Sequence, residues 1–240
     1  MKFLGTGTEK LEEQAAHTFF PARVLRWDSD TTSAKGSHGA ISQQFRDHQA
    51  DILVGTQMIA KGLDFPNVTL VGVINADTGL NLPDFRASER TFQLLSQVAG
   101  RAGRGPDGGR VVIQTYNPSY YAIQAAAKHD YTTFYDKEIT YRRQLNYPPF
   151  ARLASMVYSH TSEAACRSEA ERMAAELDTE SKSRGVAGVS LIGPATAFIY
   201  RLRGRFRWQI VVRGQDLSTF LGEIGVPQGW SIDIDPVGLV

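Results

Sequence analysis

The chain has 240 residues, with 26 Lys and Arg against 25 Asp and Glu, and 42% of its residues are hydrophobic. This composition is typical of a soluble globular protein, and the length favours two domains of about 100 to 150 residues each. No apolar stretch approaches the ~20 residues that a membrane span needs. The net charge of +1 gives no global argument for nucleic-acid binding, which requires basic residues concentrated on one surface.

The N-terminus and the cysteine content predict the compartment. Residues 1–5 contain no apolar run long enough for a signal peptide, and Cys166 is the only cysteine. A single cysteine forms neither an internal disulfide nor a cysteine-based zinc site, and the five histidines lack clustered ligand spacing. The sequence therefore predicts a cytoplasmic protein without a metal site in this chain.

The first half alternates helical patterns with short β-rich runs, which is typical of a parallel sheet covered by helices. The first predicted helix begins with Thr8 as its N-cap and repeats apolar residues at helical spacing to Phe19. Further helices are predicted over 37–48 and 87–104, the latter with Phe92, Leu95, Val98 and Ala102 as its buried stripe. Strands are predicted at Arg23–Trp27, Asp51–Val54, Val68–Asn75 and Arg110–Thr115.

A basic, aromatic helix predicted from Tyr131 to Asn146 stops at Tyr147-Pro148-Pro149-Phe150, because two prolines cannot continue a helix. We therefore expect a first domain of residues 1–130, a helical linker of 131–149 and a second domain of 150–240. The second domain is expected to be α+β, in the βαββαβ order of a ferredoxin-like fold. Its predicted elements are Arg152–Tyr158, Ser162–Ser183, Val189–Ile192, Arg207–Val212, Asp216–Ile224 and Trp230–Ile234.

The segment Gln97–Arg104 places two glycines at the end of a helix, where each costs about 1 kcal/mol relative to alanine. Gln97, Arg101 and Arg104 lie at i, i+4 and i+7, so they project from one face while the glycines let another surface approach. Guanidinium groups match phosphate oxygens and stabilise charge on a transferring γ-phosphoryl group. The alternative is a solvated basic helix end favoured by the helix dipole.

One other glycine-containing segment is a candidate phosphate site. The strand that ends at Gly55-Thr56 leads into a short helix, where backbone N–H groups and the Thr56 hydroxyl can hold a phosphate. An ordinary strand-turn-helix connection is the alternative. The segment Gly5–Lys10 lacks the Gly-Lys-Ser/Thr ending of a P-loop, and Asn75-Ala76-Asp77 lacks the acidic neighbour of a magnesium box.

Residues 97–104 resemble the QxxGRxGR sixth motif of superfamily-two helicases, and residues 52–66 resemble their fifth motif. The segment Gly5–Lys10 is similar to the fourth-motif region of one helicase branch. Three late motifs, at Pro83–Arg90, Tyr147–Phe150 and Gly204–Gln209, extend the resemblance over essentially the whole chain. They narrow it to the primosomal, replication-restart helicases.

The resemblance implies that residues 1–130 form the second RecA-like lobe, with a mostly parallel sheet, of an ATP-dependent 3'-5' DNA helicase. It implies that Arg101 and Arg104 are arginine fingers, that Gln97 orients them or contacts nucleotide, and that Gly62, Asp64 and Gly100 line the nucleotide cleft. Thr6, Thr8 and Thr56 are expected to contact the DNA backbone. For Thr6 and Thr8 a plain turn and N-cap is the alternative.

The resemblance also predicts what this chain lacks. ATP and Mg²⁺ are expected to be bound mainly by a first lobe with its P-loop, and zinc by paired cysteines, neither of which is present in the sequence. Arginine fingers without a P-loop cannot hydrolyse ATP. The isolated chain is therefore predicted to lack ATPase activity.

The segment from Tyr200 to Gln215 contains five arginines and no acidic residue: Arg201, Arg203, Arg205, Arg207 and Arg213. If Arg205 and Arg207 face one side of a strand, Phe206 and Trp208 face the other. The arginines can neutralise phosphates while an exposed aromatic stacks on a base, or they can capture an acidic peptide terminus while Phe206 and Trp208 fill the core. We favour the core position for these two rings.

The resemblance implies forked or branched DNA, the acidic tail of single-strand-binding protein and other primosome proteins as partners. A second hypothesis is a non-catalytic module that only recognises branched DNA or single-strand-binding protein. A third, resting only on the alternating βα pattern, is a nucleotide-dependent enzyme unrelated to DNA.

Overall fold

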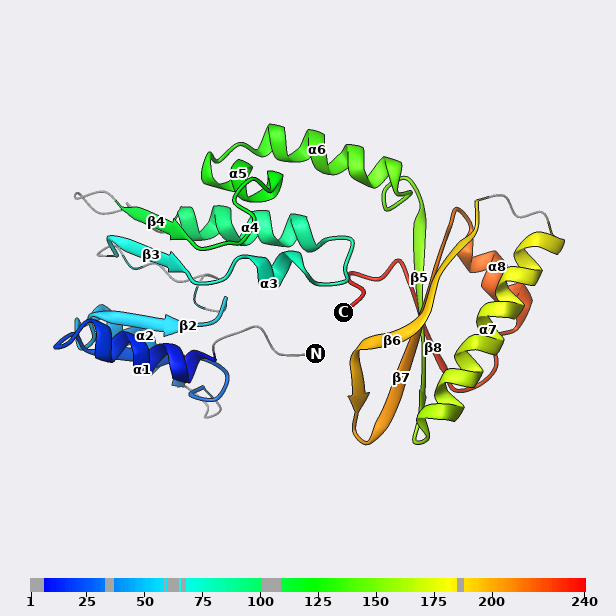
Figure 1. Cartoon of the computed structure of the whole chain (residues 1–240), viewed down its shortest axis with the longest axis horizontal. Coiled ribbons are helices and arrows are strands. Elements are labelled where there is room, and N and C mark those ends of the chain that lie inside the picture. The colour runs from blue at the N-terminus through cyan, green and yellow to red at the C-terminus, as the bar shows by residue number, and fades with distance from the viewer. Residues whose placement is uncertain are drawn as a thin grey trace. The chain divides into compact units, whose positions relative to one another are not determined.

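A computed structural model describes residues 7–32, 37–57, 59, 65, 68–100, 109–184 and 188–240. The chain forms two compact units (Figure 1). The N-terminal unit comprises Met1–Asn81 and Ser88–Phe134, and the C-terminal unit comprises Leu82–Ala87 and Tyr135–Val240. The chain therefore enters the C-terminal unit twice, the first time for a short segment only.

The N-terminal unit alternates helices with parallel strands, as the sequence predicts, but its described strands form two separate two-stranded sheets and not the single sheet expected. Its elements are α1 (Thr8–Thr18), β1 (Val24–Trp27), α2 (Ser37–Arg46), β2 (Ile52–Gly55), β3 (Leu70–Val73), α3 (Asp77–Leu80), α4 (Ala87–Ala99), β4 (Arg110–Ile113) and α5 (Tyr121–Ala127). Strand β1 pairs in parallel with β2, and β3 pairs in parallel with β4. Helices α3 and α5 are not predicted from the sequence, because four and seven residues are too few for a helical period to be read.

The described core of the N-terminal unit lies between α4, α5 and the start of α6 (Tyr131–Gln144). The Phe92 and Phe134 rings stack with centroids 4.1 Å apart, and Leu95 is 1% exposed. The buried stripe predicted for α4 is confirmed at Phe92, Leu95 and Val98, which are all buried. Its fourth predicted member, Ala102, lies outside the described residues.

The start of α1 differs from the prediction. Gly7 is the N-cap residue and has no side chain that could accept a helix N–H. Thr8 is the first residue inside the helix. The Thr8 hydroxyl bonds instead to a side chain twenty residues further along the chain. Thr8 was expected as the cap because a Thr before an apolar periodic run is a typical start signal, and a long-range partner overrides that local preference.

The C-terminal unit is built on one antiparallel sheet. Its strands are β5 (Arg152–His160), β6 (Ser190–Leu202), β7 (Arg205–Gly214) and β8 (Trp230–Ile234), in the spatial order β6-β7-β5-β8. All three strand pairings are antiparallel. Helices α7 (Glu163–Ser183) and α8 (Leu217–Ile224) cover the same face of this sheet (Figure 1).

Strand β6 is much longer than the predicted strand at 189–192. Gly193 and Pro194 weaken a strand pattern in the sequence, but an edge strand tolerates them because one of its sides needs no ladder hydrogen bonds. The pairing of β6 with β7 is irregular between Ile192 and Ala195 and again between Thr196 and Arg201. Tertiary pairing with β7 therefore extends β6 beyond what local propensity indicates.

The core of the C-terminal unit is formed by alternate residues of β5 and β7 and the inner faces of the two helices. Met156, Ile210 and Val212 are all 0% exposed, and each such side chain contributes roughly 1.5–3 kcal/mol on burial. Ser162 caps α7 by accepting the Ala165 N–H, and Asp216 caps α8 by accepting the Thr219 N–H. In the described part of the chain, no helix combines the length and apolarity needed to cross a membrane.

Candidate nucleic-acid and nucleotide interface

The carboxyl ends of β1 and β2 form a polar edge in the N-terminal unit. Trp27 and Gly55 are register partners, so Asp28 and Thr56 follow the two strands at the same edge. A Cβ on Gly55 would lie 2.1 Å from the Trp27 carbonyl oxygen, so only glycine fits there. Thr56 is exposed. Open α/β sheets bind ligands at the carboxyl ends of their strands, which makes this edge a candidate site.

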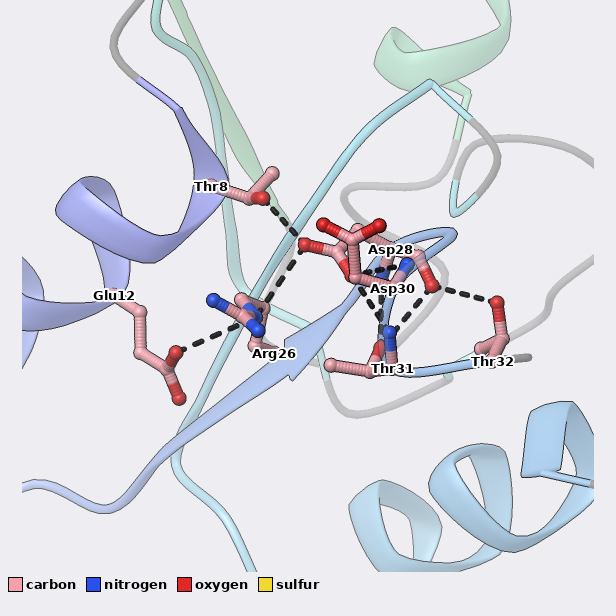
Figure 2. Close-up of polar contacts among 7 residues, drawn as sticks. All are labelled: Thr8, Glu12, Arg26, Asp28, Asp30, Thr31 and Thr32. Carbon is pink, nitrogen blue, oxygen red and sulfur yellow. Dashed lines mark hydrogen bonds and ion pairs between the residues drawn. The ribbon is translucent and has the colours of Figure 1, made fainter. Parts of the chain in front are cut away.

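Asp28 organises the loop that leaves β1 (Figure 2). Its carboxylate accepts the backbone N–H groups of Asp30 and Thr31, each at 3.0 Å. Its own carbonyl oxygen accepts the hydroxyls of Thr31 and Thr32 at 3.1 and 2.6 Å. Sequence reasoning missed Asp28, although Asp-Ser-Asp-Thr-Thr directly after an apolar strand is a typical side-chain-to-backbone turn.

The hydroxyl of Thr8 donates to the second carboxylate oxygen of Asp28 at 2.5 Å (Figure 2). This bond, followed by the Thr31 N–H, lowers the pKa of Asp28 below its ordinary value. A threonine hydroxyl has a single proton to donate, and phosphate oxygens only accept. A hydroxyl contact from Thr8 to DNA would therefore require the bond to Asp28 to break, and the backbone N–H of Thr8 at the start of α1 is the better phosphate donor.

Arg26 connects the same loop to α1. Its Nε lies 3.4 Å from the Asp28 carboxylate and 3.6 Å from the Glu12 carboxylate, close enough for ion pairs. The atom is buried and has no hydrogen-bond partner within the described residues. Arg26 therefore attracts one carboxylate of α1 and one of the loop after β1. This attraction keeps the start of α1 near the strand edge where Thr8 bonds to Asp28.

The end of helix α4 carries the described part of the predicted arginine motif. Gln97 is half-buried and Gly100 is exposed, and the Gly100 N–H donates to the Ser96 carbonyl at 3.0 Å. A Cβ on Gly100 would meet nothing closer than 3.5 Å, which is ordinary van der Waals contact. Packing within the described chain therefore does not require glycine at this position.

Five predicted site residues lie outside the described part of the chain: Thr6, Gly62, Asp64, Arg101 and Arg104. Thr8 and Thr56 are brought to one strand edge, and Gln97 and Gly100 to the end of α4. The roles assigned to all nine residues stay predictions.

A second strand edge follows β3 and β4, where the sequence places Asn75-Ala76-Asp77. Asp77 is buried, and its carboxylate accepts the Thr115 hydroxyl and the Tyr116 N–H, both at 2.9 Å. These bonds tie the loop after β3 to the end of β4. Across the described ranges, no group of three His, Cys, Asp or Glu residues is arranged to hold a metal ion.

The hairpin of β6 and β7 presents the arginine-rich segment. Arg203 and Gly204 form its turn with φ values of 49° and 80°, the left-handed conformation that a tight hairpin needs and glycine adopts readily. Arg201, Arg203 and Arg205 are exposed and Arg207 is half-buried. Within the described residues none of these four forms an ion pair, so their charge is available to an anionic partner.

The two faces of β7 separate Arg205 and Arg207 from the aromatic rings, whereas the Arg201 guanidinium of β6 lies 5.0 Å from the centre of the Phe206 ring. Residues 205, 207 and 209 share one face, whereas Phe206 and Trp208 share the face of the buried Ile210, where the helices pack. Both rings are half-buried. Phe206 lies against Tyr200 with centroids 5.4 Å apart, and the Arg167 guanidinium lies 5.8 Å from the Trp208 ring. Phe206 and Trp208 therefore lie on the core face of β7, as expected, but neither ring is completely buried.

Arg213, at the other end of β7, has a different environment from the four arginines of the hairpin. Its Nε donates to the Ser190 hydroxyl at 3.0 Å, and one of its terminal nitrogens donates to the Leu145 carbonyl. Its guanidinium also covers the Tyr147 ring at 5.6 Å. Arg213 therefore serves the packing of this unit, and the candidate anion-binding surface ends before it.

Two family models match the chain in succession. The helicase conserved C-terminal domain matches residues 6–106, which contain the edge of β1 and β2 and helix α4. The primosomal protein N C-terminal domain matches residues 143–237, which contain the four-stranded sheet. The chain therefore combines a helicase C-terminal domain, with its RecA-like α/β fold, and a primosomal C-terminal domain.

Curated relatives agree on one family. The chain is 50% identical over 213 residues to Replication restart protein PriA of Bacillus subtilis (strain 168), an alignment that covers 89% of this chain and 26% of that protein. It is 44% identical over 213 residues to Replication restart protein PriA of Synechocystis sp., covering 89% of the chain and 25% of the relative. With that of Treponema pallidum it shares 39% identity over 100% of the chain and 37% of the relative.

The chain is thus a PriA-family sequence that carries a helicase C-terminal domain followed by the family's C-terminal domain. It spans about a quarter to somewhat over a third of the length of these relatives.

Proposed function

We propose that this chain is the C-terminal part of an ATP-dependent DNA helicase of replication restart, which acts in the cytoplasm. The observation that carries the proposal is the succession of the two matched domains along one chain. The polar edge at the carboxyl ends of β1 and β2 supports it, because a translocating lobe needs backbone donors and hydroxyl groups that grip phosphates without reading sequence.

In this proposal the N-terminal unit is the second lobe of the motor. Arg101 and Arg104 approach the γ-phosphate as arginine fingers, Gln97 orients them, and Gly62, Asp64 and Gly100 line the nucleotide cleft. ATP with Mg²⁺ supplies a phosphoryl group for transfer to water and is held mainly by a first lobe. Zinc belongs to other segments of the full-length protein.

The same lobe is proposed to grip one DNA strand. Thr56, exposed directly after β2, is the hydroxyl donor, and the N–H groups at the start of α1, next to Thr6 and Thr8, are backbone donors. The side chain of Thr8 acts indirectly, by holding this helix start against Asp28. The direction of movement, expected as 3'-5', is tested with partial duplexes that carry a single-stranded tail at one end or the other.

The C-terminal unit is proposed to be a ferredoxin-like domain that binds forked DNA and protein partners. Its order of elements and its strand order of β6-β7-β5-β8 support this fold. Arg201, Arg203, Arg205 and Arg207 are the proposed DNA-binding residues, and they suit both phosphates and the acidic tail of single-strand-binding protein. Other primosome proteins are expected as further partners.

Reconstitution tests the motor role. The 240-residue chain alone is expected to show no ATPase above background, whereas the chain mixed with a separately made first lobe regains DNA-stimulated turnover. Robust hydrolysis by the chain alone would disprove the division of the site between two lobes.

The alternative is a non-catalytic binding module for branched DNA or single-strand-binding protein. The absence of carboxylate partners from the hairpin arginines, within the described residues, favours a binding role for this surface under either hypothesis. The two hypotheses differ at the helicase motifs. If Arg101→Ala and Arg104→Ala leave strand separation and fork binding by the full-length protein unchanged while Arg205→Ala and Arg207→Ala abolish binding, the module hypothesis is correct.

A further inference from the structure

A cluster of rings and guanidinium groups in the C-terminal unit joins two segments that are far apart in the sequence. Phe85 belongs to the short segment Leu82–Ala87, and Tyr147 follows α6. Their rings stack with centroids 5.9 Å apart and planes 24° apart. The guanidinium groups of Arg86 and Arg142 lie 5.2 and 5.5 Å from the centre of the Phe85 ring. Phe85 is therefore held by one ring and two cations.

The position of Arg142 is itself determined by α6. Its Nε donates to the Glu138 carboxylate at 2.7 Å, and both side chains are largely buried, at 13% and 10% exposure. A second nitrogen of Arg142 donates to the Pro148 carbonyl at 3.4 Å. A buried ion pair of this kind is costly to break by removing one partner, so the cation that covers Phe85 has little freedom to move away.

Hydrogen bonds from the residues beside Phe85 hold the end of the chain. The Asp84 carboxylate accepts the Leu239 N–H at 3.1 Å, and the Arg86 guanidinium donates to the Val237 carbonyl at 3.2 Å. The other carboxylate oxygen of Asp84 accepts the Arg86 N–H at 2.8 Å, which fixes the shape of the segment. Leu82–Ala87 is thus attached to this unit on both sides of Phe85.

The same segment leads without interruption into helix α4. Ala87, its last residue, is buried, and its N–H donates to the Asp84 carbonyl at 3.0 Å. Helix α4 then continues through Phe92 and Leu95, in the core of the N-terminal unit, to Gln97 at the start of the arginine motif. An α-helix is a stiff rod of about 1.5 Å per residue, so a force at one end is carried to the other.

We propose that Phe85 is a positioning residue of the motor: its socket of Tyr147, Arg86 and Arg142 anchors the start of α4 in the C-terminal unit. Through this anchor, movement of the arginine motif during ATP hydrolysis is transmitted to the DNA held by the C-terminal unit. The inference rests on the proposed helicase function. If the socket is loosened, ATP hydrolysis continues, but less of the movement that it drives reaches the DNA.

The test measures ATP hydrolysis and strand separation together in the full-length protein that contains this chain. Phe85→Leu removes the ring but keeps an apolar side chain, and it is expected to lower strand separation about tenfold while DNA-stimulated ATPase stays within about twofold. Phe85→Tyr keeps the ring and should restore strand separation. Tyr116→Leu is the control, because Tyr116 is an aromatic residue that is 84% exposed.

A merely structural role predicts a different pattern. Loss of packing alone lowers the melting temperature and reduces ATPase and strand separation in the same proportion, and that result would overturn the inference. It would also be overturned if Phe85→Leu left both activities unchanged in a protein whose wild type unwinds DNA. If the wild-type protein itself shows no ATP-dependent strand separation, the proposed function fails instead, which separates the two outcomes.

Discussion

The two units carry their candidate sites on different kinds of framework. In the N-terminal unit the polar edge lies at the ends of strands of four residues each, β1 and β2. In the C-terminal unit the arginines lie along a hairpin of strands of 13 and 10 residues, β6 and β7. The polar residues at the ends of β1 and β2 are held by loops, whereas Arg201 and Arg205 flank the hairpin turn on strands that pair with each other.

This difference has consequences for what each site can do. A loop-held edge keeps donors such as the Thr56 hydroxyl and the first N–H groups of α1 available, and it depends on single anchors such as Asp28 to keep its shape. Arg205 and Arg207 lie two residues apart on β7, so the strand itself sets their spacing whether or not a partner is bound. We therefore predict that single substitutions at the N-terminal edge disturb its structure strongly. At the hairpin, we predict that binding depends mainly on the charge of the arginines.

The largest effect is expected at the arginine motif. Arg104→Ala in the full-length protein should lower kcat for DNA-stimulated ATP hydrolysis by about 1,000-fold or more, because an arginine finger stabilises charge only in the transition state. DNA affinity at the hairpin should stay unchanged. Arg110→Ala, at an exposed arginine of β4, is the matched control. Equal ATPase activity in both variants would show that Arg104 has no catalytic role.

A large loss of stability is expected in the sheet of the C-terminal unit. Met156→Ala should cost about 2–5 kcal/mol, because Met156 is wholly buried between β5 and the helices. Hydrogen exchange on the 240-residue chain locates the change, which is expected in β5, β7 and β8 and not in β1 and β2. Loss of protection throughout both units would show that the two units unfold together and not independently.

A smaller, pH-dependent loss is expected at the N-terminal edge. Asp28→Asn removes a carboxylate that accepts from Thr8 and Thr31, at a cost of about 2 kcal/mol at neutral pH. The pKa of Asp28 is lowered in the folded chain, so the ionised form stabilises the fold above the ordinary pKa, and this stability is lost as the pH falls through the lowered pKa.

Urea titrations of the two proteins between about pH 7 and pH 3 provide the measurement. The gap in unfolding free energy between wild type and Asp28→Asn should be widest near neutrality and should close in acid. A gap of constant size across this range would assign the loss to packing instead of charge.

The smallest effect concerns the salt dependence of DNA binding. Arg205→Ala should reduce the slope of log K against log salt by about one unit on forked duplex, since one phosphate contact is lost. Arg172→Ala, whose guanidinium is already paired with Glu169 and Glu176 on α7, should leave the slope as it is. If both variants change the slope equally, overall charge and not the hairpin surface governs binding.

Much of the architecture could be read from the sequence. The alternation of strands and helices, the buried stripe of α4 at Phe92, Leu95 and Val98, and the extent of β8 all follow local periodicity, which a chain expresses before it folds. The family motifs likewise identified the helicase and primosomal domains that the comparisons found. The candidate roles of Arg101 and Arg104 rest on those motifs alone.

Long-range pairing decided the rest, for reasons that no local pattern contains. The length of β6 depends on its partner β7, the hydroxyl of Thr8 is taken by Asp28, and Arg213 is drawn into packing by Ser190 and Leu145. Phe85 and Tyr147 appear in the sequence as two separate motifs, and only the folded chain stacks one ring on the other. Periodicity and motif spacing report what neighbours along the chain prefer, whereas a hydrogen bond or a ring contact depends on which distant group folding brings within reach.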